Sequence, residues 1–347
     1  MDEKRKVPNL LIPREAFVFS QSQIGRMARE NRKIINKRVH SLREMKGEKA
    51  LPKGSKKLDI DQTREVFLNL FMDIKSDIKH KVHTFYNFKG GTGKTTICYQ
   101  ISTMLAFMGF KVLTIDCDPQ AHLTSLLGIP EQEDYPTIYD VLVNMRALKE
   151  VTISVFNGLD IIPSSLSLTR IESPLNQMVR RENILLKMLQ SEDSKTSQYD
   201  FIMIDTNPAF SVLNLNALMA CQQLNVVCET HPLSLSGLSL MIEELQRVYK
   251  ELQKDMNFVV IPNKYEAKTA TSQEILGVLR KDYKQETIQT VIRKCEDINV
   301  STKRRLPVLC FANKNSIAME DIIDLGHEFI ALSRGKPFVI SGQEEAA

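Results

Sequence analysis

Short apolar runs alternate with longer amphipathic segments from residue 82 onward. The runs are rich in Val, Ile and Phe and are too short for helices, which is typical of buried strands. We therefore expect strands at 82–87, 111–116, 200–205, 224–228, 258–261 and 308–311, and one that ends at 161–163. The intervening segments have helical composition, and we expect helices at 97–107, 179–190, 212–222, 236–254 and 271–283.

This alternation predicts an α/β fold in which a mostly parallel, twisted sheet is flanked by helices on both faces. Parallel strands bring their carboxyl ends to one edge of the sheet, and ligands bind outside that edge. Polar and acidic residues directly follow several of the predicted strands. The residues that carry chemistry are therefore expected where these strands end.

The first 58 residues have a different pattern, which predicts two short helices. The first starts near Ser20 or Ser22, either of which can cap it, and the second spans Arg32–Met45. The apolar residues of the second helix fall on one stripe, and its other faces are basic. This arrangement fits a helix-turn-helix whose second helix enters the major groove of DNA, with 46–57 as a basic wing. An amphipathic helix pair with a solvated basic face remains the alternative. The candidate DNA contacts are Arg32, Lys33, Lys37, Arg38 and Arg43.

A longer helix is expected to start at Asp59 or Asp61 and to connect this amino-terminal arm to the rest of the chain. Its apolar residues form a wide stripe from Val66 to Ile78. Such a stripe must be buried, either against the body of the protein or against a second copy.

Composition and charge narrow the class of protein. The 347 residues include 43% apolar residues, which is ordinary for a globular protein, and six scattered cysteines without a C-x-x-C pair. This usage argues against a zinc ribbon or a disulfide framework and fits a reducing cytoplasm. No apolar run is long enough for a membrane span, so we expect no membrane partner. Residues 1–82 hold 20 Lys and Arg against 11 Asp and Glu, a balance of +9, and the remainder balances at −5. A basic arm on a mildly acidic body favours nucleic acid as a partner of the arm.

A glycine-rich loop lies between the strand expected at 82–87 and the helix expected at 97–107. Strand, glycine loop and helix together form the context of a phosphate-binding loop, in which backbone N–H groups and the helix terminus face one anion. Lys94 would reach the outer phosphates, and the Thr95 hydroxyl would hold Mg²⁺. The candidate nucleotide-binding residues are Lys89, Gly90, Gly91, Thr92, Gly93, Lys94, Thr95 and Thr96.

Three carboxylates follow strands and could complete the site. Asp116 and Asp118 come at the end of the strand at 111–116, and Asp205 ends the strand at 200–205. Carboxylates beside a triphosphate can hold Mg²⁺ or orient an attacking water. The spacing alone does not decide which of Asp116 and Asp118 holds the metal and which orients the water.

These motifs resemble those of the ParA/MinD family of P-loop ATPases. The family's loop reads K-G-G-x-G-K-T-S/T, and Lys89 to Thr96 matches it, with Phe88 in place of the usual first glycine. Residues 116–120 resemble its D-x-D-P-Q motif, and Asp205 its Walker B aspartate, although Asn207 replaces a family proline. The resemblance implies ATP, ADP and Mg²⁺ as ligands. It also implies that Lys89 contacts the nucleotide of a partner subunit in an ATP-closed homodimer.

The resemblance assigns roles to individual residues. It implies catalysis by Lys89, Lys94 and Asp118, with Asp118 orienting the hydrolytic water. Thr95, Asp116 and Asp205 would hold the metal, and Asn263 would contact the base. A late basic cluster would hold DNA without sequence preference, with Lys268, Arg293 and Lys294 as its candidate contacts.

The resemblance further implies a partition ATPase whose hydrolysis a ParB-like centromere-binding protein stimulates. It would be cytoplasmic and associated with the nucleoid, and its arm would bind an operator to repress its own operon. The expected domains are a winged helix-turn-helix at 1–58, a linking or dimerisation helix at 59–81, and a P-loop ATPase domain at 82–347.

Three alternatives stay open. A MinD-like positioning ATPase would need a basic, amphipathic membrane helix at its end, and residues 338–347 close acidic instead. A metabolic or redox P-loop enzyme, such as a nitrogenase-reductase or amidotransferase relative, would share the loop. A transcriptional repressor could bind ATP as a structural ligand alone.

Overall fold

The computed structural model describes residues 11–45, 57–78, 80–131, 135–191, 194–313 and 315–334. Within these ranges, a seven-stranded sheet forms the centre of the fold, with strand order β5-β6-β4-β7-β3-β8-β9. All its pairs are parallel except β5 with β6. The strands are β3 (Lys81–Tyr86), β4 (Val112–Cys117), β5 (Ile153–Phe156), β6 (Leu159–Ile162), β7 (Phe201–Thr206), β8 (Gln223–Glu229) and β9 (Phe258–Asn263).

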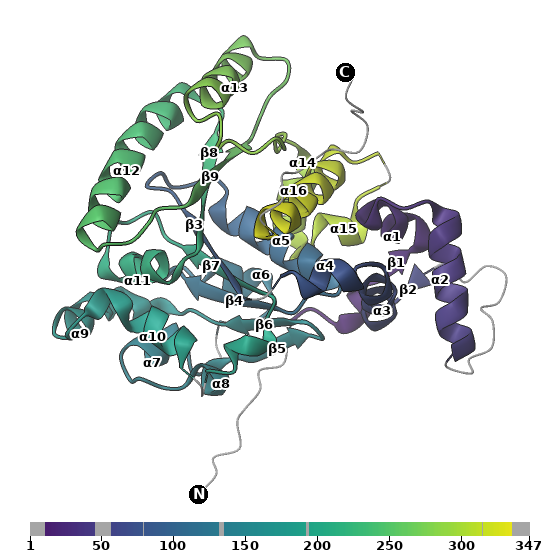
Figure 1. Ribbon diagram of the computed structural model, residues 1–347, viewed down its shortest axis with the longest axis horizontal. Coiled ribbons are helices and arrows are strands. Elements are labelled where there is room, and N and C mark those ends of the chain that lie inside the picture. The colour runs from purple at the N-terminus through teal and green to yellow at the C-terminus, as the bar shows by residue number, and fades with distance from the viewer. Residues whose placement is uncertain are drawn as a thin grey trace, which may run out of the picture.

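Helices cover both faces of this sheet, as Figure 1 shows. Successive side chains of a strand point to opposite faces, so the central strands are apolar throughout. On β7, Phe201 and Met203 pack into the core on the α5 and α16 side, while Ile202 and Ile204 pack on the side of α7, α10 and α11. The α/β fold with a mostly parallel sheet is therefore confirmed.

The body helices are α5 (Lys94–Phe107), α6 (His122–Leu126), α7 (Ile138–Leu142), α8 (Leu148–Val151), α9 (Glu172–Asn176), α10 (Ile184–Gln190), α11 (Val212–Ala220), α12 (Pro232–Glu251), α13 (Ala270–Asp282), α14 (Glu296–Arg304), α15 (Val308–Phe311) and α16 (Ile317–Ser333).

The strand expected at 308–311 is wrong, because these residues form the short helix α15. The N–H of Val308 donates to the side chain of Gln100 on α5, and the N–H of Ala312 donates back to the carbonyl of Val308. A helical turn thus provides hydrogen bonds for the backbone of this segment, which lies against α5 and not at an edge of the sheet. The other expected strands are present within one or two residues of their predicted bounds.

The linking helix is also broken where one helix was expected. It consists of α3 (Ile60–Leu70) and α4 (Met72–Ser76), which meet at Phe71. Its apolar side is buried against the body, since Val66 and Phe67 belong to the same core as α5. Asp59, and not Asp61, caps α3 by accepting the N–H of Gln62.

The amino-terminal arm contains α1 (Gln21–Ala28), α2 (Arg32–Met45) and a small antiparallel pair of β1 (Phe19–Ser20) and β2 (Lys57–Leu58). Ser20 caps α1 in a reciprocal bond with Gln23, which settles the choice between Ser20 and Ser22. Of the expected basic wing at 46–57, only Lys57 lies within the described residues. Residues 338–347, at the end of the chain, lie outside the described residues.

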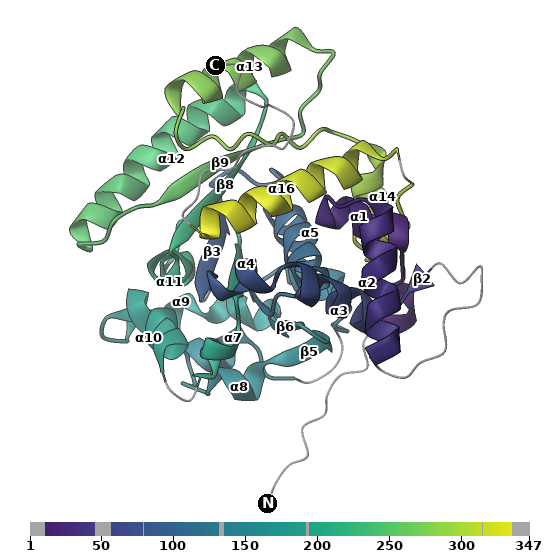
Figure 2. The same ribbon diagram turned by 45° about the vertical axis from the view of Figure 1, so that its right-hand side comes forward.

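The arm packs directly against α15 and α16, which lie beside it in Figure 1, and Figure 2 shows α16 next to α1 again. Arg29 pairs with Asp324 at 2.7 Å, and the ring of His327 bonds to the carbonyl of Met27 at 2.7 Å. Burial, aided by the nearby charge of Arg29, lowers the pKa of His327 to about 4, so the ring is neutral and donates this bond. Phe17 and Phe19 contact the ring of Phe107 on α5. Arm and body therefore share one hydrophobic core.

Arg64 of α3 ties the linking segment to the helix that starts at the glycine-rich loop. Its buried guanidinium donates to the carbonyl of Ala106 in the last turn of α5 and to those of Gly109 and Phe110, which follow the helix. The carbonyl of Ala106 also accepts the N–H of Gly109, and that of Gly109 also accepts the ammonium of Lys75. A cation at a helix carboxyl end is favourable, so Arg64 adds charge-assisted bonds there. The side chain also fills the space beside Gly158, where a Cβ would collide with it.

We predict that Arg64→Met destabilises the fold by about 2–4 kcal/mol, because it removes three buried hydrogen bonds from a charged donor. Chemical unfolding monitored by circular dichroism measures this change. Arg247→Met is the matched control, since its side chain is 73% exposed and pairs with Glu244 on the same helix; it should cost less than about 0.5 kcal/mol. Equal losses for the two variants would contradict the role of Arg64.

Candidate nucleotide-binding site

The glycine-rich loop joins β3 to α5 at the carboxyl edge of the sheet, the edge at which the parallel strands β3, β4, β6, β7, β8 and β9 end. Gly91 and Gly93 have φ values of 74° and 99°, which disfavour any side chain. A Cβ on Gly93 would also collide with the amide of Asn263. The side chain of Asn87 anchors the start of the loop by donating to the carbonyl of Val227 on β8 at 2.8 Å. Thr95 and Thr96 follow in the first turn of α5, and Gly90 is exposed.

Asp116 and Asp205 lie side by side at this edge. They are register partners on the adjacent parallel strands β4 and β7, and both are fully buried. Asp116 is held by three donors, namely the N–H of Asp118 and the N–H and hydroxyl of Thr124. Burial raises the pKa of Asp116 to about 6 despite these bonds. Asp116 is thus oriented by the chain itself.

Asp205 has the opposite environment. Neither of its carboxylate oxygens has a hydrogen-bond partner among the described residues, although the nearby Thr95 hydroxyl favours its ionised form. Burial raises its pKa well above the usual value, and the charge of Asp116 adds to this. Buried charge without a partner is costly, so such a group requires a cation or a proton. The oxygens of Asp205, Thr95 and Asp116 are of the kind that Mg²⁺ prefers, so the residues present fit this metal.

The chain alone does not supply a full metal cage. No group of three or more His, Cys, Asp or Glu side chains suited to a metal occurs in the described part of the chain. Mg²⁺ commonly binds through one or two protein ligands together with water and substrate phosphates. The donor set at Asp205 fits that pattern.

Asp118 lies just outside this pair and is nearly buried, with 9% of its surface exposed. One of its oxygens accepts the N–H of Gln120, and its backbone carbonyl accepts the hydroxyl of Ser164 at 2.5 Å. The loop after β4 is therefore held by the segment that follows β6. Lys94 is buried close by, and the carboxylates of Asp205 and Asp118 partly offset the fall in its pKa that burial causes.

Lysines from three positions converge on the loop. The ammonium of Lys94 donates to the carbonyls of Asn87 and Lys89, at 3.3 and 3.2 Å. Lys89 pairs with Glu229 at 2.8 Å, and Lys264 donates to Glu229 and to the carbonyl of Gly91 at 2.5 and 2.6 Å. The sequence pattern alone does not single out Glu229. Its position as the last residue of β8, like Asp205 near the end of β7, is the signal that could have found it.

Asn263 shapes the loop. Its amide nitrogen donates to the carbonyl of Thr92 at 2.7 Å, and its amide oxygen accepts the N–H of Lys264. Its contact with a base stays a prediction, because both polar atoms of its side chain are already engaged. Thr92 itself is buried, and its hydroxyl has no partner among the described residues.

A cleft of about 1040 Å³ opens beside the loop. Gly91, Gly93 and Thr96 line one side of it, and the segments after β9 and before α14 line the other. Its volume is ample for a nucleotide, since ligand sites typically enclose about 300–1,000 Å³.

The residues expected to bind DNA have different surroundings. Lys33, Lys37 and Arg38 are exposed on α2, and Lys268 is exposed before α13. Arg293 instead forms ion pairs with Glu320 and Asp321 of α16, and Lys294 pairs with Glu266. Arg32 and Arg43 belong to α2, in the same helix as the exposed lysines.

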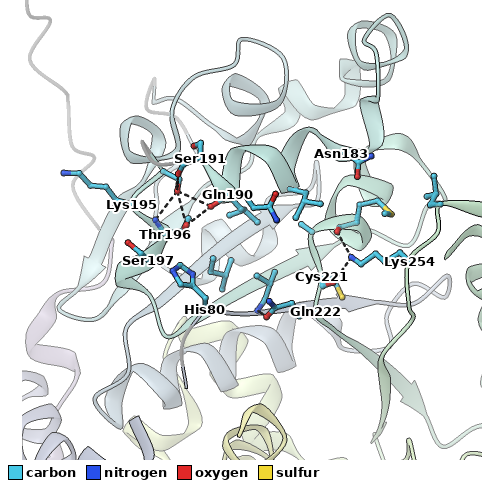
Figure 3. Close-up of a pocket in the computed structure, with 18 residues that line it drawn as sticks. His80, Asn183, Gln190, Ser191, Lys195, Thr196, Ser197, Cys221, Gln222 and Lys254 are labelled. Carbon is cyan, nitrogen blue, oxygen red and sulfur yellow. Dashed lines mark hydrogen bonds between the residues drawn. The ribbon is translucent and has the colours of Figure 1, made fainter. Parts of the chain in front are cut away.

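A second cavity, of about 970 Å³, lies near the start of β3, away from the glycine-rich loop (Figure 3). Its polar groups are mostly satisfied by the chain. Lys254 donates to the carbonyls of Leu218, Met219 and Cys221, and Ser194 and Thr196 bond to each other. The lysine and these two hydroxyl groups are therefore engaged by the chain itself.

None of the helices in the described ranges combines the length and apolar composition that crossing a bilayer requires.

Comparisons with known proteins agree with this geometry. A family model described as an AAA domain matches residues 80–258, just over half of the chain. The cell division protein PomZ of Myxococcus xanthus is 34% identical over 245 residues, which cover 70% of this chain and 76% of PomZ. The sporulation initiation inhibitor protein Soj of Bacillus subtilis is 27% identical over 253 residues, which cover 72% of this chain and 98% of Soj.

Solved structures share the fold. A putative plasmid partition protein from Borrelia burgdorferi bound to AMPPNP superposes with a TM-score of 0.60 at 25% identity, covering 74% of this chain and 99% of that protein. Cobyrinic acid a,c-diamide synthase from Mycobacterium smegmatis, with bound ADP and magnesium, has a TM-score of 0.62 at 22% identity, covering 73% and 94%. With the loop and its carboxylates, these matches show that the chain belongs to the ParA/MinD-type family of P-loop ATPases.

Proposed function

We propose that this chain is an ATP-dependent partition ATPase that segregates DNA. The observation that carries this proposal is the pair of buried carboxylates, Asp116 and Asp205, beside the glycine-rich loop and Lys94. The chain binds ATP with Mg²⁺, closes into a homodimer, holds DNA without sequence preference and hydrolyses ATP slowly. A ParB-like centromere-binding protein stimulates hydrolysis and thereby releases the dimer.

The nucleotide phosphates lie against the backbone of residues 90–96 and the positive amino-terminal end of α5. Lys94 exchanges its bonds to loop carbonyls for the outer phosphates, which supply a stronger, charged partner. Thr95 and Asp205 hold Mg²⁺, with Asp116 in support. When bound, Mg²⁺ neutralises charge on the phosphates.

Asp118 orients the water that attacks the terminal phosphate. Asp116 is occupied by Thr124 and by the N–H of Asp118, so it is the less available of the two carboxylates. One oxygen of Asp118 accepts from Gln120, and the other has no bond in the described residues. This difference supports the assignment that the motif alone left open.

Exposed apolar side chains around the loop support dimerisation through the carboxyl edge. Leu166, Phe210 and Leu233 follow β6, β7 and β8, and they are 69%, 48% and 73% exposed. Exposed apolar patches commonly mark protein interfaces. A second copy facing this edge would bury these side chains and bring Lys89 of each subunit close to the other's nucleotide.

DNA binding rests on two surfaces. The exposed lysines and Arg38 of α2 suit operator phosphates, so the arm could repress the protein's own operon. Non-specific DNA binds to the late basic cluster, where Lys268 is the most available candidate. Arg293 and Lys294 contribute only if they exchange their carboxylate partners for phosphates. The protein acts in the cytoplasm on nucleoid DNA.

A positioning ATPase is the second candidate. PomZ is named a cell division protein, and its similarity to this chain is the observation that favours it. Both candidates share the nucleotide cycle and differ in the cargo, so the identity of the stimulating partner separates them.

Asp118→Ala should lower ATP turnover by about 10²-fold and leave ATP binding and dimerisation in place, because a water-orienting group acts in the chemical step. A phosphate-release assay and a binding titration measure the two effects. Asp255→Ala, at an exposed position before β9, is the control and should leave turnover unchanged. Undiminished turnover in Asp118→Ala would contradict the assignment.

Lys89→Ala should weaken the ATP-dependent dimer by about tenfold or more and spare nucleotide binding by the monomer, because it removes a charged contact to the partner's phosphates. Light scattering over a range of protein concentrations measures the dimer. Lys187→Ala changes an exposed lysine of α10 and should have no effect. A dimer of normal strength in Lys89→Ala would refute the contact across subunits.

Binding to random-sequence duplex DNA should appear with ATP and Mg²⁺ but not with ADP, since only the dimer presents two copies of the basic surface. It should also fall steeply with salt, because phosphate contacts release counterions. Fluorescence anisotropy with the two nucleotides in parallel tests this. Equal binding in both nucleotides would favour an ATP-bound repressor instead.

A further inference from the structure

Glu229 holds two lysines at the carboxyl edge of the sheet. It is the last residue of β8, and its side chain is only 16% exposed. One carboxylate oxygen pairs with Lys89 of the glycine-rich loop at 2.8 Å, and the other pairs with Lys264, which follows β9, at 2.5 Å. Although burial opposes ionisation, these lysines hold the pKa of Glu229 below its usual value. The carboxylate is therefore charged at neutral pH and fully used within its own chain.

Lys89 has a second partner that fixes its direction. Its ammonium also donates to the hydroxyl of Ser234 at 2.9 Å, and Ser234 is buried in the first turn of α12. The backbone of Lys89 is fixed as well, since its N–H donates to the side chain of Asn87 at 2.9 Å. Two contacts thus place this side chain against β8 and α12 of its own subunit, and a third holds its backbone.

Lys264 strengthens the arrangement from the other side. Its ammonium bonds to Glu229 and to the carbonyl of Gly91, so it joins the carboxylate to the loop. Its backbone has a φ of 54°, a strained value for a residue with a side chain. Glu229, Lys89 and Lys264 therefore form one network that spans the mouth of the loop.

One ammonium group cannot serve Glu229 and a phosphate of another subunit at the same time. Under the function proposed above, Lys89 must leave Glu229 and Ser234 before it can reach the partner's nucleotide. Breaking a charge-assisted pair costs free energy, so Glu229 competes with dimerisation.

We propose that Glu229 is a positioning residue that retains Lys89 within its own subunit and so sets the concentration at which the protein dimerises. This inference rests on the cross-subunit role of Lys89 in the proposed function. Dimerisation becomes an exchange of one anionic partner of Lys89 for another. The retained lysine therefore opposes dimerisation.

The size of the effect follows from the exposure of the pair and from symmetry. The Lys89 side chain is 39% exposed, so solvent partly screens its ion pair with Glu229. Breaking this pair therefore raises the dimer dissociation constant by about threefold for each subunit. Formation of a symmetric dimer breaks one such pair in each subunit, so the two factors of about three multiply. Removing the carboxylate charge should lower the dimer dissociation constant by about tenfold.

The experiment compares Glu229→Gln with the unchanged protein by light scattering, with Mg²⁺ and the analogue AMPPNP, which prevents turnover. Half-maximal dimerisation should occur at about tenfold lower protein concentration. Ser234→Ala removes one of the two side-chain partners of Lys89 and should shift dimerisation in the same direction by a smaller factor. Glu243→Gln changes an exposed carboxylate of α12 and is the matched control, with no shift expected.

Two further experiments test whether Glu229 acts through Lys89. In a Lys89→Ala background, Glu229→Gln should have no further effect on dimerisation, because the residue acts through Lys89. In the protein without nucleotide, Glu229→Gln should increase the acetylation of Lys89 by an amine reagent relative to exposed Lys268, as mass spectrometry detects. A structural role alone would not produce this pattern.

The outcomes separate the inference from the function beneath it. If Lys89→Ala leaves the dimer unchanged, both the cross-subunit role and this inference are wrong. If Lys89→Ala weakens the dimer but Glu229→Gln and Ser234→Ala leave it unchanged or weaken it, only the inference is wrong. Thermal unfolding of each variant establishes that it is folded, and Ser234→Ala provides the test should Glu229→Gln fail to fold.

Discussion

Two carboxylates buried next to each other on parallel strands are the constraint on which this site depends. Asp116 and Asp205 repel each other at the end of β4 and β7, and burial makes both charges expensive. Asp116 accepts hydrogen bonds from Thr124 and from the N–H of Asp118, whereas the oxygens of Asp205 have no hydrogen-bond partner among the described residues. Asp205 keeps the need for a cation, so the fold itself creates a place where a metal and its phosphates are favoured. The negative charge of these carboxylates also stabilises the positively charged lysines at the same edge.

Much of this architecture could be read from the chain because the strands are buried on both faces. Apolar runs such as 200–205 leave little choice of structure, and the aspartates that end two of these runs, Asp116 and Asp205, mark the edge of the sheet. The loop at 88–96 could be identified for a related reason, since its glycines and lysines suit few other environments. Periodicity failed where a run was too short to distinguish a strand from a helix, as at 308–311, where contacts with α5 decide the outcome.

Residues defined by a distant partner were the hardest to predict. Nothing local to Arg293 indicates that Asp321 and Glu320 will occupy it, because they lie on a helix that follows it in the chain. Asn263 is similar, since its bond to Thr92 joins β9 to a loop far earlier in the sequence. Glu229 looks like one more carboxylate until the fold brings Lys89 and Lys264 to it. Such roles depend on tertiary contacts, which a local pattern does not contain.

The shared core between arm and body also bears on how such proteins can change over evolutionary time. Phe17 and Phe19 contact Phe107 of the helix that begins at the glycine-rich loop, and α16 holds the arm through Asp324 and His327. An arm joined only by a flexible tether could be exchanged by recombination without regard to the domain it serves. Here a new arm would have to bring matching aromatic rings and a partner for Asp324. Arm and body are therefore expected to be inherited together, as one unit.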